Sequence, residues 1–117
     1  MGQIAERDWK VLRRIRDDAL HRLSVRMLSG VRNMVSEVDL NGDAHSAFLS
    51  ICRYVHDQNL ELGDLFDDWR RSTAITTLMR WASAAIITEE EFADFSVETK
   101  ELVRSMIEVK FYDEKKA

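Results

Sequence analysis

Residues 9–34 read WKVLRRIRDDALHRLSVRMLSGVRNM, a stretch with no proline and a single glycine. Its apolar side chains recur every three or four residues, which places them along one side of an α-helix. The clearest positions in this repeat are Leu20, Leu23, Met27, Gly30 and Met34. Such spacing is typical of the seam between two packed helices. We therefore expect a long helix from about Ala5 to Ser36, with Asp8 as an N-cap-like side chain near its start.

Proline is absent from the whole chain of 117 residues, and glycine occurs only four times. Average usage is about 5% proline and about 7% glycine. Because proline breaks helix interiors, its absence leaves few positions at which the backbone has to leave a helix. The hydrophobic fraction of 45% is sufficient for a core without disulfides or metal. We predict an all-α fold in one domain over residues 1–117: a compact bundle of about five helices, four main and one short.

Turn and capping signals divide the rest of the chain into helices. Asn41-Gly42 predicts a turn, and Asp43 is the expected N-cap of a second helix over about residues 44–62. Gly63-Asp64 predicts the end of that helix and the start of a third helix over about residues 65–86.

A capping box follows the third helix. The side chain of Thr88 can accept from the backbone N–H of Glu91, whose carboxylate can bond back to the backbone of Thr88. The segment 86–92, Ile-Ile-Thr-Glu-Glu-Glu-Phe, resembles the turn in the short C-terminal helical hairpins of many bacterial proteins. Ala85 stands near the position where those hairpins usually have glycine. The resemblance implies a helix–turn–helix shape and no function; Ser96 is the expected N-cap of the last helix.

The third predicted helix is apolar on two sides. Arg80 is the only charged residue between Ile75 and Ile87. Such a helix either is central in the core or lies between the core and a partner chain, and the sequence leaves both possibilities open. Tryptophan and methionine are favoured at interface centres. We predict two candidate sets of interface residues, the first on this helix and the second on helix one. They are Leu78, Trp81 and Ala85, and Leu20, Leu23 and Met27.

Charge is distributed unevenly along the chain. Residues 1–36 carry eight basic and four acidic side chains, whereas residues 37–117 carry nine basic and 17 acidic ones, and the net charge is −4. We favour neutralisation of the basic first helix within the chain or across a dimer, and binding of an external anion stays open. Nucleic acid is not an expected partner, because the chain as a whole is acidic and the basic residues lack interleaved aromatics.

Three potential metal ligands, His45, Cys52 and His56, fall along one line of the second predicted helix. Cys52 and His56 are one turn apart and can reach one ion, whereas His45 is roughly 10 Å from Cys52. No CxxC or HExxH motif accompanies them. Half-buried histidine and a small buried cysteine are also ordinary at the edge of an apolar face. We therefore predict no metal and no cofactor, and keep a metal or thiol site as an alternative.

Composition narrows the functional classes. A single cysteine excludes an internal disulfide, and no apolar run reaches the 18 residues of a membrane span. We expect a cytoplasmic protein that is not an enzyme: a small protein–protein interaction or regulatory module that self-associates as a homo-oligomer. An alternative is a bacterial immunity or antitoxin-type inhibitor, because a small helical protein with an acidic second half suits a basic partner.

Overall fold

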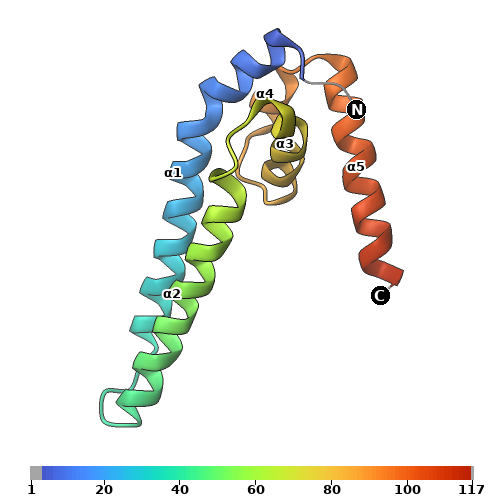
Figure 1. The fold of residues 1–117 in the computed structure, drawn as a ribbon. Helices are drawn as coiled ribbons and strands as arrows, with labels where there is room; N and C mark the ends of the chain where they lie inside the picture. Colours follow the sequence, from blue (N-terminus) through green and yellow to red (C-terminus); the bar gives the residue numbers. More distant parts are fainter. Residues whose placement is uncertain (1–3, 117) are drawn as a thin grey trace.

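A computed structural model describes the backbone of residues 4–116 and the side chains of residues 4–110 (Figure 1). Its elements are α1 (Glu6–Ser36), α2 (Ala44–Phe66), the 3₁₀ turn η1 (Arg71–Thr73), α3 (Ala74–Ser83), α4 (Glu89–Ala93) and α5 (Val97–Lys116). The described residues thus contain five α-helices and no strand, which confirms the all-α prediction.

Two parts of different shape make up the molecule. Helices α1 and α2 run antiparallel, side by side, and their far ends project from a head that contains η1, α3 and α4 (Figure 1). The described chain measures 56 × 35 × 23 Å and has a radius of gyration of 17.6 Å. A compact domain of this length has a radius of gyration of about 13 Å. The difference arises because the hairpin projects well beyond the head and α5 also extends away from it (Figure 1).

The hydrophobic core lies in the head. Trp81 of α3 is fully buried, and its indole N–H donates to the backbone oxygen of Leu65 at 2.9 Å. Its ring stacks on Phe66 with centroids 5.1 Å apart and on Trp69 with centroids 6.0 Å apart. One side chain therefore joins α3 to the end of α2 and to the segment that follows it. The other core residues are Ile4, Val11, Leu12, Ile15, Ala19, Leu23, Ala74, Ile75, Leu78, Ile86, Phe95 and Val103.

The boundary between the second and third helices differs from the prediction. Helix α2 continues through Gly63 to Phe66, and α3 begins only at Ala74. Gly63 does not adopt a positive φ, so it does not end the helix as a C-terminal glycine would. Burial of Leu65 and Phe66 in the core stabilises this additional helical turn.

Local capping signals agree with the structure at two positions. The side chain of Asp43 accepts from the backbone N–H of Ser46 at 3.1 Å, and the Thr88–Glu91 capping box is complete. The structure does not use Asp8 as the N-cap of α1, because Ala5 occupies that position and makes no side-chain cap. Asp8 is instead a buried residue of the first turn.

Asp8 joins the beginning of α1 to the beginning of α5. Its carboxylate accepts from the backbone N–H and the hydroxyl of Ser96 at 2.8 and 2.6 Å and from the Thr99 hydroxyl at 2.7 Å. Burial acts to raise the pKa of Asp8, but these hydrogen bonds and the nearby charge of Arg7 lower it further than burial raises it. The charged carboxylate is therefore the form that the fold stabilises.

Helix α3 ends in a Schellman motif that has alanine where glycine is usual. The backbone N–H of Ile86 donates to Trp81 O at 3.2 Å, and that of Ala85 donates to Ala82 O at 3.1 Å. Ala85 has a φ of 56°, in the left-handed region that disfavours a side chain with Cβ.

We expect Ala85→Gly to raise the free energy of unfolding by about 1 kcal/mol, because glycine adopts this φ without steric strain. Chemical denaturation followed by circular dichroism measures the change. Ala84→Gly is the matched control: Ala84 has a helical φ of −80°, so glycine there should destabilise the protein. Equal shifts in the two variants would contradict a strained backbone at residue 85.

Candidate interaction surface

Three of the six predicted interface residues lie inside the molecule. Leu78 and Trp81 have no exposed surface, and Leu23 is buried as well. These three side chains pack in the core between α1, α2 and α3 and have no surface to offer to a partner. The apolar excess of the third predicted helix is therefore core, which corrects the assignment of Leu78 and Trp81 to an interface.

The remaining predicted interface residues are partly accessible. Leu20 and Met27 are half-buried against the core. Ala85 is exposed, but its backbone oxygen accepts from Arg26 at 2.8 Å as part of the turn after α3. None of the three contributes a large exposed apolar side chain.

The projecting hairpin has no buried residue between Ser24 and Asp64. Its two helices meet along a seam of half-buried side chains. The seam consists of Met27, Gly30, Val31 and Met34 from α1 and Ala47, Ile51, Tyr54 and Gln58 from α2. Gly30 allows the close approach, since a Cβ atom at that position would overlap the hydroxyl of Tyr54. A two-helix seam alone leaves the other sides of both helices in contact with solvent.

Four large apolar side chains are exposed beside this seam. Leu28 and Val35 of α1 are 68% and 55% exposed, and Phe48 and Val55 of α2 are 63% and 46% exposed. At about 100° of rotation per residue, each pair lies roughly a quarter turn from the seam in the direction of increasing residue number. Because α1 and α2 are antiparallel, this rotation leads to the same side of the hairpin on both helices.

These side chains also share the same levels along the hairpin. Gly30 faces Tyr54, so Leu28 lies within one residue of the level of Val55. By the same count, Val35 lies within one residue of the level of Phe48. We call the surface formed by Leu28, Val31, Val35, Phe48, Cys52 and Val55 the apolar face of the hairpin.

The opposite side of the hairpin is polar and contacts the head. Arg22 donates to Glu91 at 2.6 Å and to the backbone oxygen of Ile86 at 3.1 Å. Arg26 donates to the backbone oxygen of Ala84 at 2.6 Å. Both arginines lie about half a turn around α1 from Leu28 and Val35. The head therefore lies away from the apolar face and does not cover it.

Neutralisation of the basic helix occurs within the chain for some of its arginines. Arg14 pairs with Asp94 at 2.6 Å and Arg22 pairs with Glu91 at the same distance. Burial acts to raise the pKa of Glu91, but the hydrogen bonds from Arg22 and from the Thr88 backbone lower it further than burial raises it. For these residues, the favoured interpretation of the uneven charge agrees with the structure.

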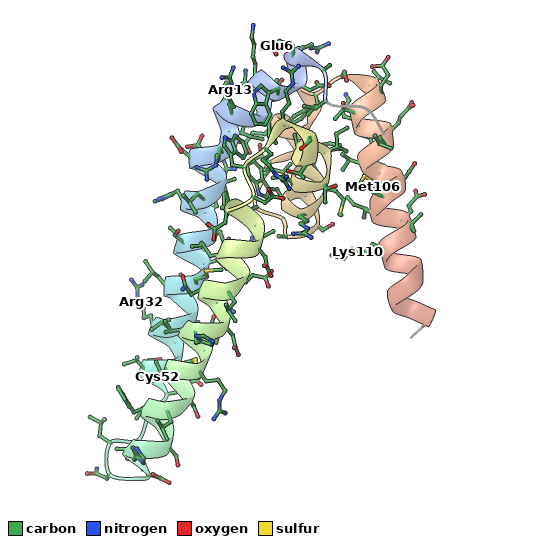
Figure 2. The ribbon with its side chains drawn as sticks, viewed as in Figure 1. Glu6, Arg13, Arg32, Cys52, Met106 and Lys110 are labelled. Carbon is green, nitrogen blue, oxygen red and sulfur yellow. The ribbon has the colours of Figure 1, made fainter. Side chains whose placement is uncertain are left out.

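The potential metal ligands on α2 are exposed. His45, Cys52 and His56 all belong to α2. Figure 2 shows Cys52 on the projecting hairpin. No group of three or more His, Cys, Asp or Glu side chains comes together as a metal site among the residues that the structure describes. Cys52 instead lies between Phe48 and Val55 in the apolar face.

A shallow cleft of about 470 Å³ lies between α4 and α5. Ile87, Phe92 and Ile107 form part of its apolar lining, and Lys100 and Arg104 lie beside them. The two cations already have contacts, because Lys100 donates to the backbone oxygen of Ala93 and Arg104 stacks over Phe92. Fewer large apolar side chains are exposed at this cleft than on the hairpin.

Leu28 and Val35 were not among the interface residues predicted from the sequence. The signal was a second apolar line on α1, Leu28, Val31 and Val35, one position after the line through Met27 and Met34. Two adjacent apolar lines indicate a helix that packs against more than one neighbour.

Comparison with known proteins gives no relative: no family model, no curated protein and no solved structure matches this chain. Within residues 4–116, none of the helices has the length and apolar character needed to cross a membrane.

Proposed function

We propose that this protein is a non-catalytic protein–protein interaction module and that the apolar face of the hairpin is its binding surface. One observation carries the proposal. Leu28, Val35, Phe48 and Val55 share one side of a projecting element that has no buried residue between Ser24 and Asp64. Large exposed apolar surfaces of this kind mark binding sites on proteins.

The chemistry of the face supports binding rather than catalysis. Its side chains are aliphatic, aromatic or, at Cys52, a thiol. Apolar side chains gain free energy when they leave water, but they neither transfer protons nor stabilise developing charge. An exposed thiol in this position also fits a reducing compartment, so we propose a cytoplasmic location.

Photo-crosslinking tests whether the apolar face meets a protein in cells. We expect benzoylphenylalanine at position 48 to give covalent adducts with protein, because Phe48 lies in the face. The matched control is the same residue at position 50, since exposed Ser50 lies about half a turn around α2. Adducts are measured by mass shift and mass spectrometry. Absence of protein adducts from both positions in the folded protein would contradict the proposed function.

A second candidate function is supported by acids on the polar side of α2. Asp57, Glu61 and Asp64 are exposed there and share a side with Ser50. An inhibitor of the immunity or antitoxin type would present such a surface to a basic partner. Adducts with a basic protein at position 50, without adducts at position 48, would favour this alternative.

A further inference from the structure

We propose that a second copy of this chain covers the apolar face, so that two hairpins pack face to face as a four-helix bundle. This inference rests on the proposed function and specifies its partner. Two antiparallel helices that already share a seam need one further two-helix layer to bury their common apolar side. A second copy supplies an identical layer, and a two-fold axis lets the same six residues of each copy meet.

The apolar face is large enough to form the centre of a dimer interface. Leu28, Val35, Phe48 and Val55 together expose roughly 400 Å² per copy, about half of the roughly 800 Å² per partner of a standard interface. The exposed Cys52 and the half-buried Val31 add to this area. An exposed apolar patch of this size falls within the range of the largest patches on monomeric proteins, which are often functional. Contacts at the rim, where Ser24 and Asn59 lie, would supply the remainder.

The charge pattern of the face permits a second copy to bind there. No residue of the apolar face is charged, although 32% of the chain is charged and its net charge is −4. Two copies therefore repel each other over most of their surfaces but meet without like-charge repulsion at this face. A strongly basic partner would gain no Coulombic attraction here, since the acidic side chains that would attract it lie on another side of α2.

Access to the face is open along the hairpin. Arg22 and Arg26 hold the carboxyl end of α3 against the other side of α1, so the head does not obstruct an approaching copy. The tip-ward part of the hairpin projects beyond the head (Figure 1). A second hairpin can thus lie along the whole length from Leu28 to Val35.

The test compares Phe48→Asp with Leu49→Asp. Both wild-type side chains are exposed, at 63% and 47%, so neither change removes a core contact. Leu49 points away from α1, about 100° from Phe48 around α2, and lies outside the face. Analytical ultracentrifugation gives the mass, and the rate of reaction of Cys52 with Ellman's reagent reports whether the face is covered, because Cys52 is the only cysteine.

For the wild type and Leu49→Asp, we expect twice the chain mass of 13.6 kDa and a slow thiol. For Phe48→Asp we expect the single chain mass, unchanged helical circular dichroism and a Cys52 rate at least about tenfold higher, as for an uncovered thiol. The proposed dimer would be overturned if the wild-type protein at micromolar concentration had the mass of one chain and a rapidly reacting Cys52. The interaction module would survive that result if position 48 still crosslinks to another protein.

A wild-type dimer that Phe48→Asp leaves intact would also overturn this inference, because another surface would then hold the copies together. Loss of the dimer in both variants would overturn it too, since the effect would not depend on the face. The proposal is supported only if Phe48→Asp and Leu49→Asp differ both in mass and in the reaction rate of Cys52.

Discussion

Replacing Asp8 with alanine is expected to lower the free energy of unfolding by roughly 3 kcal/mol, the range for breaking a buried hydrogen-bonded charge. The carboxylate is fully buried and receives three hydrogen bonds from Ser96 and Thr99. Alanine would leave these donors without their acceptor and would remove the link between the start of α1 and the start of α5. Urea denaturation followed by circular dichroism measures the loss.

Asp8→Asn is the matched control for this prediction. Asparagine has nearly the same shape and keeps one acceptor oxygen, but its amide group cannot accept the bonds that the second carboxylate oxygen receives. We expect its stability to fall between those of the wild type and Asp8→Ala. If both variants unfold within 1 kcal/mol of the wild type, the Asp8 cluster does not stabilise the head in solution.

The same cluster sets a pH dependence. The pKa of Asp8 is lowered in the folded state from its ordinary value of 3.8, so the folded protein holds this proton less tightly than the unfolded chain. The stabilisation is fully present above pH 3.8 and is lost as the pH falls through the lower folded pKa. Asp8→Ala should therefore lose less stability between neutral pH and pH 3 than the wild type does, with Glu91 contributing in the same direction to both.

Local sequence signals predicted the elements that local interactions determine. The first helix was expected from Ala5 to Ser36 and runs from Glu6 to Ser36. The Thr88 capping box and the Asp43 cap were also predicted correctly, because each is formed within three residues along the chain. Absence of proline sufficed for the fold class, since it removes the commonest interruption of helices.

Tertiary contacts determined the features that sequence analysis did not predict. Gly63 has the residue type of a helix end, but burial of Phe66 keeps the helix going past it. Asp8 has the residue type of a cap for the nearest helix, but its partners are 88 and 91 positions away. In both cases the local preference is worth about 1 kcal/mol and is smaller than the gain from burial or a hydrogen-bond cluster.

The interaction surface depends on which apolar line of α1 meets α2. One line contains Met27 and Met34, and the next contains Leu28 and Val35; their composition is similar. The structure places the line with Gly30 in the seam, because glycine lets Tyr54 pack against the backbone of α1. The line with Leu28 then remains exposed, and only the arrangement of the helices distinguishes it from core.

Replacing Trp81 with alanine is expected to cost about 4 kcal/mol, within the range for deleting a buried aromatic side chain. Trp81 has no exposed surface, and it bonds Leu65 and stacks on Phe66 and Trp69. A cavity at this position would separate α3 from the end of α2. Chemical denaturation measures the loss, and with total stabilities of 5–15 kcal/mol typical of proteins, the variant should be close to unfolding at physiological temperature.

Trp81→Phe separates the two contributions of this side chain. Phenylalanine keeps an aromatic ring for stacking but cannot donate to Leu65, so we expect a smaller loss of about 1–2 kcal/mol. If Trp81 were instead an interface residue, Trp81→Ala would dissociate an oligomer and keep its helical signal. Because Trp81 is in the core of the head, Trp81→Ala should lose the dimer and the helical signal together. Phe48→Asp should instead dissociate the dimer and leave the helical signal unchanged.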